Sequence, residues 1–315
     1  MKSFRIALII GFLVAVSSCG SGDDSATTSP ASTPSTSQSA TTTESSATTS
    51  TSTSIATPPS TATPTTPTTT TSVVPTLTDV KIYLLRDERL AIVHRLVPGP
   101  AVLRGALTEL LAGPTDAERA DGLGSEVPLG TELLDVDLAD GLGTVDLSSD
   151  FESGGGSLSM TARVAQVVFT VTQFGNADQA LFWMDGQPIE FLGGEGLVLD
   201  EPQARMDVDR ALSGSVIIDT PEYGATVSSP FTVTGEGDVF EAQFPIEIWA
   251  NGQQIGGIAP VTAGAWGTWA DFEVTITLDA PAGPIELIAY DAGGCGTGPD
   301  CPPIIKTVVP LTFTG

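Results

Sequence analysis

The sequence has one histidine, three cysteines and few basic side chains. Its 315 residues contain 12 Lys and Arg against 38 Asp and Glu, which gives a formal net charge of −26. With His94 alone, zinc motifs that need paired histidines are excluded, and no Gly-x-Ser-x-Gly motif supplies a hydrolase serine. So acidic a chain repels phosphate backbones, which excludes nucleic acid as a partner.

The negative charge is spread along the chain instead of being confined to a tail. Residues 79–210 carry 23 acidic and nine basic side chains, whereas residues 214–315 carry 12 acidic side chains and one base, Lys306. We interpret this acidity mainly as a means of keeping an extracytoplasmic protein soluble. Basic proteins or cations are the alternative partners that it would suit.

Long apolar runs are also missing, apart from a short one near the N-terminus. Lys2 and Arg5 are followed by an apolar stretch over 6–16, which is shorter than the roughly 20 residues of a membrane-spanning helix. It leads into VSSC, a lipobox that ends at Cys19. Small residues before a cysteine suit a lipoprotein signal peptidase, so we predict a signal peptide over 1–18. An ordinary cleaved secretory signal is the alternative.

Residues 19–76 have the composition of a disordered linker. Ser, Thr, Ala and Pro dominate this stretch, and it cannot form a core. Fully extended at about 3.1 Å per residue, it would reach on the order of 170 Å. We therefore expect lipid chains on Cys19 to hold the mature protein on the extracytoplasmic face of the cell membrane, with the linker setting its reach.

The other two cysteines, Cys295 and Cys301, lie close together in a Gly- and Pro-rich stretch near the C-terminus. In an oxidising compartment we expect them to form a disulfide that closes a short loop. A metal site is the alternative, but two thiols without neighbouring histidines make an incomplete ligand set.

The segment 77–210 mixes strand and helix patterns, which predicts an α+β domain. Alternation of apolar and polar residues indicates strands, apolar residues at helical spacing indicate helices, and Asp-Gly pairs indicate hairpin turns. In order, we expect a hairpin of strands at 80–84 and 90–97, a helix from Val102 to the Gly113-Pro114 pair, a short helix opened by a Thr115/Glu118 capping box, a hairpin that turns at Asp140-Gly141, a helix over 160–174, and a hairpin that turns at Asp185-Gly186.

After Gly214 the helical spacing disappears. Short alternating runs separated by Pro and Gly predict an all-β sandwich over 214–315. The expected strands are 215–218, 231–233, 246–250, 272–278, 285–290 and 306–313.

Both segments resemble domains found together in bacterial proteins. The first resembles the GerMN domain of sporulation and germination proteins, through VKIY at 80–83, ALTELLAGPT at 106–115, VDLS at 145–148 and VFTVTQF at 168–174. The second resembles the immunoglobulin-like domain of bacterial spore germination proteins, through Pro221, Gly224, VSSP at 227–230, VTG at 233–235, Phe240, Gly267, Phe272 and VVPL at 308–311. The resemblance implies a lipoprotein without established catalytic residues. Similar domains also occur in non-sporulating bacteria, including lipoproteins that accompany envelope sensor kinases.

Several residues have side chains suited to catalysis or ligand binding. His94 is expected to be an ordinary strand histidine beside Arg95, and the glycine run 154–156, which no Lys-Ser/Thr follows, to be a loop. The carboxylates of Asp135, Asp137 and Asp140 suit calcium, but alternation explains the first two as a solvated strand face. We expect at least two of three tryptophans to lie in the sandwich core, and sugar stacking is their alternative role. The three are Trp249, Trp266 and Trp269.

These observations predict a non-enzymatic envelope lipoprotein without cofactor or metal, whose two domains present surfaces to another envelope protein. A cell-wall glycan-binding protein, or a weak peptidoglycan hydrolase that uses paired carboxylates, is one alternative. Accessory control of an envelope sensor kinase is another.

Overall fold

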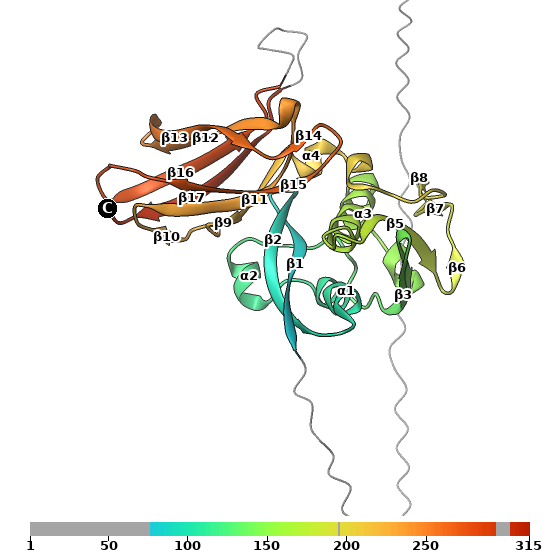
Figure 1. Ribbon diagram of the computed structural model, residues 1–315. Helices are drawn as coiled ribbons and strands as arrows, with labels where there is room; N and C mark the ends of the chain where they lie inside the picture. The colour runs from blue at the N-terminus through green and yellow to red at the C-terminus, as the bar shows by residue number, and fades with distance from the viewer. Residues whose placement is uncertain (1–75, 195, 294–302) are drawn as a thin grey trace, which may run out of the picture. The chain divides into compact units, whose positions relative to one another are not determined.

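The computed structural model describes residues 76–194, 196–293 and 303–315, which lie within one compact unit (Figure 1). The predicted lipidation site Cys19, the expected disulfide of Cys295 and Cys301, and the segment 1–75 lie outside the described residues. Among those described, no helix is long and apolar enough to cross a membrane.

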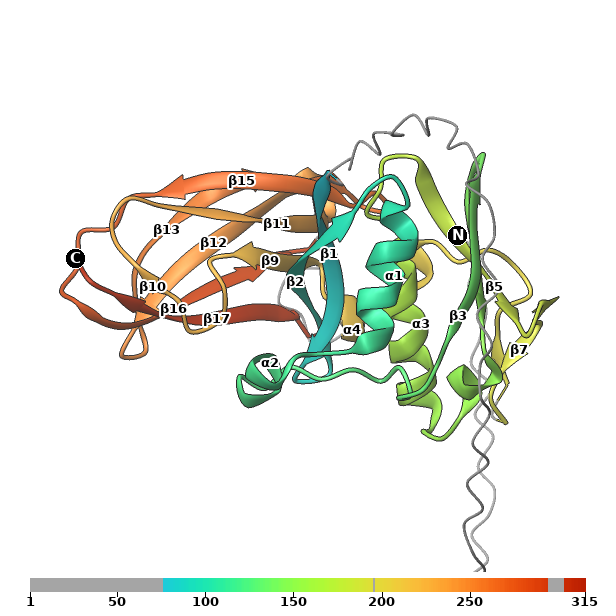
Figure 2. The same ribbon diagram turned by 90° about the horizontal axis from the view of Figure 1, so that it is seen from below.

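The first domain begins with a long antiparallel hairpin of β1 (Leu77–Arg86) and β2 (Arg89–Pro98). Asp87 and Glu88 form its two-residue turn with φ of 49° and 63°, a left-handed geometry that matches the twist of the strands. The predicted hairpin is confirmed, and it forms a separate two-stranded sheet. One face of this sheet packs on helices α1 and α3 (Figure 2).

Helix α1 (Val102–Ala112) ends at Gly113, as the Gly-Pro pair predicts, and buries Ala106, Leu107 and Leu110. Helix α2 (Asp116–Ala120) begins with the predicted capping box. The Thr115 hydroxyl accepts a hydrogen bond from the Glu118 amide, and the Glu118 carboxylate accepts one from the Thr115 amide. These local signals lie within a few residues of each other, which explains why they were readable from sequence.

A four-stranded sheet in the order β3-β4-β5-β6 completes the first domain. Strands β3 (Leu133–Ala139) and β4 (Gly141–Leu147) form the predicted hairpin. Strand β4 then pairs in parallel with β5 (Ala177–Met184). The sequence patterns did not predict this parallel pairing. Helix α3 connects β4 to β5 in the chain, and the pairing depends on how this helix packs on the sheet.

Helix α3 (Ser157–Val171) is the central element of the first core, and its last ten residues, 162–171, are all buried. Its valines form a helix despite their β propensity because nearly every position packs against the sheets. The predicted end was three residues too late. Phe174 lies after the helix but still packs, partly buried, on the same core. Its place in the apolar pattern therefore reflects burial and not helical structure.

The third expected hairpin is shorter than predicted. Strand β6 is only Gln187–Pro188, and β7 (Phe191–Leu192) pairs with β8 (Leu197–Val198) instead of continuing along β5. Proline lacks the amide that a longer ladder needs at this point. The remaining short elements of the first domain and its exit are the 3₁₀ turns η1 (Ser149–Glu152) and η2 (Arg205–Asp207) and helix α4 (Arg210–Ser213).

The second domain is the predicted β-sandwich. One sheet has the order β10-β17-β16-β12-β13, and in the other β11 pairs with β9, β15 and β14. All six expected strands are present. The strands are β9 (Val216–Thr220), β10 (Thr226–Val227), β11 (Phe231–Val239), β12 (Gln243–Ala250), β13 (Gln253–Thr262), β14 (Gly264–Ala265), β15 (Ala270–Ile276), β16 (Gly283–Tyr290) and β17 (Lys306–Phe313), with a 3₁₀ turn η3 (Phe240–Ala242) after β11.

Strand β13 was not predicted. It lies at the edge of its sheet and contains Gly256, Gly257 and Pro260, residues that are tolerated at an edge and that hide the alternating pattern. The two domains have separate cores, yet they meet at strand β9. Ile217 belongs to the core of the first domain, whereas its neighbours Val216 and Ile218 belong to the sandwich core.

Candidate functional site

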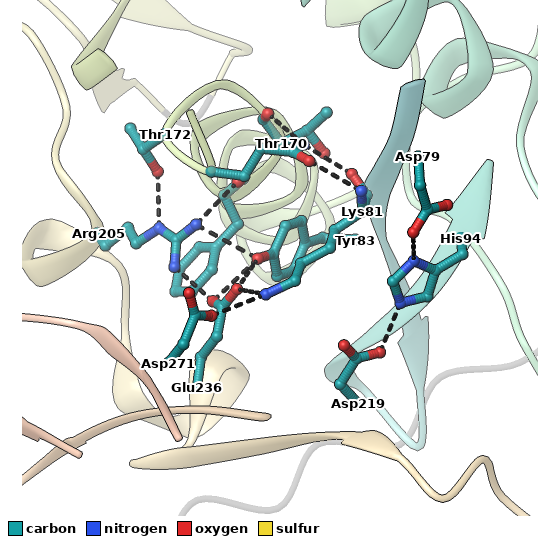
Figure 3. A network of polar contacts seen from close by, with 12 residues as sticks. Asp79, Lys81, Tyr83, His94, Thr170, Thr172, Arg205, Asp219, Glu236 and Asp271 are labelled. Atoms are coloured by element: carbon teal, nitrogen blue, oxygen red, sulfur yellow. Dashed lines mark hydrogen bonds and ion pairs between the residues drawn. The ribbon is translucent and has the colours of Figure 1, made fainter. Parts of the chain in front are cut away.

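The carboxylate of Glu236, on β11 of the second domain, lies at the centre of a buried ionic network (Figure 3). Lys81 Nζ lies 2.5 Å from Oε1, and Arg205 Nη1 lies 2.5 Å from Oε2. The Tyr83 hydroxyl donates to the same carboxylate, at 2.7 Å from Oε1 and 2.9 Å from Oε2. Two of these partners are on β1, so one side chain of the sandwich holds the first domain at three points.

The backbone around Glu236 explains how this side chain reaches the first domain. Strand β11 has an irregular register between Thr234 and Gly235, where it pairs with β9. A Cβ atom at Gly235 would lie 2.2 Å from the Ile217 carbonyl oxygen, and one at Gly237 would lie 3.0 Å from the Ala263 side chain. The Gly-Glu-Gly sequence therefore allows a close backbone approach that places the carboxylate toward β1.

Arg205, near the end of the first domain, joins the network to helix α3. Its Nε donates to the Thr172 hydroxyl at 2.7 Å, and its Nη2 donates to the Phe169 carbonyl at 3.3 Å. The guanidinium also lies over the Phe169 ring, 4.6 Å from the centroid. Arginine suits this position because its planar group donates in several directions while stacking on an aromatic face.

The electrostatics keep the network ionised. Burial by itself would raise the pKa of Glu236, but the positive charges of Arg205 and Lys81 outweigh it and hold that pKa below its usual value. Burial and the Glu236 charge raise the pKa of Tyr83 well above its usual value, so the phenol stays protonated and donates. Lys81 has a second, exposed partner in Asp271 at 2.9 Å. Each charge in the network thus has an opposite partner, as buried ions require.

An aromatic contact accompanies the ions. Trp269 of the second domain packs on the core of the first domain, with its ring edge-on to Phe169 at a centroid distance of 5.1 Å. The expectation that at least two tryptophans lie in the sandwich core is wrong: Trp249 is only partly buried, and Trp266 is 69% exposed. The sandwich core consists of aliphatic side chains and phenylalanines. Trp269 lies at the domain junction instead, and Trp266 lies at the surface.

His94 forms a second polar contact between the domains. Its Nδ1 lies 2.7 Å from Asp79 on β1, and its Nε2 lies 2.7 Å from Asp219 on β9 (Figure 3). Partial burial lowers the pKa of His94, but the bonds to both carboxylates outweigh it and raise that pKa above its usual value. The sequence placed His94 correctly in a strand, but not between two acids, because Asp219 is 125 residues away.

A cleft of about 520 Å³ opens beside β2. Its walls come from β2, from the loop after α2, from β9 with the turn that follows it, and from the start of β17. Four of its lining residues are the cations Arg86, Arg89, Arg95 and Lys306. The cleft is therefore built by both domains, and the junction described above holds its two walls in place.

The other residues considered from sequence have simple structural partners. Asp135 pairs with Arg104 at 2.5 Å. Within the described ranges, no group of three His, Cys, Asp or Glu residues could hold a metal ion. The glycine run 154–156 is a loop that covers Arg163, whose guanidinium donates to the carbonyls of Phe151, Ser153 and Gly154.

Fold and junction together define the class: a protein with an α+β domain joined through buried ion pairs to an immunoglobulin-like sandwich. The family models agree with this division. Residues 81–190 match the Germane family, described as sporulation and spore germination. Residues 215–294 match the Gmad2 family, described as the immunoglobulin-like domain of bacterial spore germination. The chain thus carries a GerMN-like domain followed by this immunoglobulin-like domain.

Solved structures are similar to parts of the chain at low identity. The first GerMN domain of the sporulation protein GerM from Bacillus subtilis is 23% identical with a TM-score of 0.35, and the match covers 41% of this chain and 99% of that one. The tandem GerMN domains of the same protein are 18% identical with a TM-score of 0.37, covering 64% and 61%. A putative lipoprotein from Clostridium perfringens is 22% identical with a TM-score of 0.32, covering 44% and 93%. No curated protein matches the chain.

Proposed function

We propose that this protein is a non-enzymatic, lipid-anchored protein of the cell envelope that presents its two domains as one joined surface to another envelope protein. The observation that carries the proposal is the junction around Glu236. Domains within a chain usually move relative to one another unless their interface is large or strongly bonded. Here a buried carboxylate bonded to Lys81, Tyr83 and Arg205 opposes such motion.

A fixed junction suits recognition because a partner then binds both domains without ordering them first. The chemistry of the network supports this role. Both oxygens of the Glu236 carboxylate already accept strong hydrogen bonds, and the groups around it are paired with each other. Such an arrangement stabilises a geometry instead of offering an unoccupied acid or base to a substrate.

The proposal includes the anchor. Lipid chains on Cys19 and a linker over 19–76 would keep the two domains near the outer face of the membrane at a high local concentration for a partner in the same envelope. The wording of both family models, sporulation and germination, is consistent with a process that takes place in the envelope.

The test is cross-linking of the full-length protein in its own cells. A photoreactive residue is placed at exposed positions of both domains, and cross-linked envelope proteins are identified by mass spectrometry. We expect one protein to be captured from both domains, and its capture to fall in Glu236→Ala but not in Glu273→Ala, an exposed acid on β15. Capture of no envelope protein above background would overturn the proposal. So would a partner whose capture is unchanged in Glu236→Ala.

One observation favours a second function, glycan binding. The exposed ring of Trp266 lies edge-on to Phe240 with centroids 6.4 Å apart, and exposed aromatic faces stack on sugars. Incubation of the protein with purified peptidoglycan separates the two functions. Binding that Trp266→Ala abolishes would support a glycan module, and released sugars would indicate a hydrolase. An altered phosphorylation of a response regulator on deletion of the gene would indicate a sensor kinase as the partner.

A further inference from the structure

The two edges of the β1–β2 sheet differ. At the outer edge of β1, the Gln173 side chain accepts from the Lys81 amide and donates to the Lys81 carbonyl. The Gln166 side chain donates to the Tyr83 carbonyl. Leu85 exchanges two backbone hydrogen bonds with Gly124. The outward groups of Lys81 and Leu85 and the outward carbonyl of Tyr83 are thus satisfied by α3, by Gln173 just after it, and by the loop after α2.

This arrangement fixes which backbone groups point outward on β2. In an antiparallel pair, residues whose backbone groups point away from the partner strand face each other. Tyr83 is opposite Ile92, and Leu85 is opposite Leu90. Since Tyr83 and Leu85 bond outward from β1, the amides and carbonyls of Ile92 and Leu90 point outward from the opposite edge, away from β1.

Within the described part of the chain, no strand is hydrogen-bonded to the outer edge of β2, which pairs with β1 alone, and β9 lies across the cleft from it. No hydrogen bond reaches the outward amides and carbonyls of Leu90 and Ile92 from the described residues. The cleft of about 520 Å³ lies along this edge, and all residues from Arg89 to Arg95 line it. A row of free backbone groups therefore faces a space of the size that small ligands and short peptides fill.

Four cations line the same cleft: Arg86, Arg89, Arg95 and Lys306. Arg95 is paired there with Glu118 at 2.7 Å. Arg86, Arg89 and Lys306 have no salt bridge to a described carboxylate, although most other cations outside the cleft do. Arg89 Nη1 donates to the Lys306 backbone carbonyl at 2.7 Å, which brings Arg89 to the start of β17, while the Lys306 ammonium lies 4.8 Å from the centroid of the Tyr290 ring.

Carboxylates are present in the lining as well. Glu118 is neutralised by Arg95, and Asp219 lies against His94. Asp87, Asp121 and Glu222 also line the cleft. An acidic ligand must therefore avoid these three and place its own carboxylates at the end where Arg89 and Lys306 meet. Elsewhere the surface of the second domain, which has no other base, repels it.

We propose that an extended segment of a partner protein with acidic side chains binds in this cleft as a third strand on β2, with its carboxylates at Arg89 and Lys306. The backbone bonds would supply affinity and the cations would set register and choice of partner, as in other cases of strand addition. This inference rests on the proposed function, since it assigns the partner contact to one place on the joined surface. Charged residues at a sheet edge also serve to prevent such pairing, so the two roles must be separated by experiment.

The probe is a pair of strand-forming hexapeptides, acetyl-TEVEVT-amide and acetyl-TKVKVT-amide, titrated into the isotope-labelled protein. We expect the acidic peptide to perturb amide signals of β2, β9 and the start of β17, and to slow hydrogen exchange at Leu90 and Ile92. We expect the basic peptide to bind roughly tenfold more weakly, a ratio typical of two exposed ion pairs. A double variant Arg89→Glu, Lys306→Glu should reverse this preference.

Two substitutions at one position separate backbone pairing from side-chain contact. Ile92→Pro removes the outward amide and breaks no bond to β1, because proline is tolerated where the amide would face away from the ladder. Ile92→Ala removes the side chain and keeps the amide. Strand addition predicts that Ile92→Pro binds the acidic peptide at least several-fold more weakly than Ile92→Ala. Hydrogen exchange of β1 shows that both variants are folded.

Three results would overturn the inference: no perturbation by the acidic peptide at millimolar concentration, perturbation centred elsewhere, or equal binding by the two Ile92 variants. These results leave the cross-linking test of the proposed function unaffected, since a partner can bind the joined surface at another place. Conversely, peptide binding without a cross-linked envelope protein would retain the site and remove the proposed function.

Discussion

The phenol of Tyr83 and the carboxylate of Glu236 belong to different domains and lie in direct contact, with the hydroxyl 2.7 Å from one carboxylate oxygen and 2.9 Å from the other. Both side chains are buried, and 153 residues separate them in sequence. A buried hydrogen bond to a charged group contributes about 1.5–3 kcal/mol. The contact therefore makes the folding of one domain depend on the other.

Replacement of Glu236 should destabilise the protein strongly. Glu236→Ala leaves Lys81 and Arg205 without their shared buried partner, and we expect a loss of about 3–5 kcal/mol in the free energy of unfolding. Urea denaturation followed by tryptophan fluorescence measures this loss. The control Glu273→Ala, at an exposed acid, should stay within about 0.5 kcal/mol of the wild type. A smaller effect at Glu236 than at Glu273 would show that the network does not join the domains.

Tyr83→Phe tests the hydroxyl separately from the ring. The ring lies 5.3 Å from that of Phe169, and phenylalanine preserves this packing. Loss of the donor should cost about 1–3 kcal/mol, since the buried carboxylate keeps its charge and loses one bond. Because Glu236 bonds both Tyr83 and Arg205, the losses of Tyr83→Phe and Glu236→Ala should be less than additive in the double variant. Additive losses would contradict the network.

The contact of His94 predicts a pH dependence. Its pKa is raised in the folded state, so protonated His94 between Asp79 and Asp219 stabilises the junction. This stabilisation is fully present below the pKa of an unfolded histidine, about 6.5, and is lost as the pH rises through the higher folded value. As the pH is raised from about 6 to above neutral, the urea midpoint of the wild type should therefore fall more steeply than that of His94→Gln. Parallel curves would exclude this role.

Trp269 should matter for stability and Trp266 should not. Trp269 packs edge-on against Phe169, and Trp269→Ala should cost about 2–3 kcal/mol, less than for a fully buried ring. Trp269→Phe should cost clearly less, because the buried Trp269 indole nitrogen has no hydrogen-bond partner to lose. Trp266→Ala, at a side chain 69% exposed, should stay within about 0.5 kcal/mol. The same urea experiment ranks the three variants.

The proposed anchor is tested by Cys19→Ala. The variant should lose incorporation of labelled fatty acid and move from the membrane fraction to the soluble fraction, because no other lipid-bearing cysteine is expected. A variant with Cys295→Ala instead should keep both properties. Unchanged labelling and fractionation of Cys19→Ala would remove the anchor from the proposed function.

The sequence by itself determined the local elements and the order of the domains. Alternation at 80–84, the Gly113-Pro114 pair and the Thr115/Glu118 capping box each act over a few residues, and the structure has the corresponding strand, helix end and cap. The family resemblance rested on the same short patterns, and both family models match.

Only the tertiary structure decided what those elements do together. Apart from its flanking glycines, nothing in the sequence distinguishes Glu236 from the other acids among the 38 Asp and Glu residues. Its role follows from the fold, which places it between Lys81, Tyr83 and Arg205. The Gly-Glu-Gly sequence around it was the one local signal of a close backbone approach. The parallel pairing of β4 with β5, the position of Trp269 and the free edge of β2 likewise depend on contacts between distant segments. Such contacts follow from packing and from the pairing of buried charges, which no short stretch of sequence specifies.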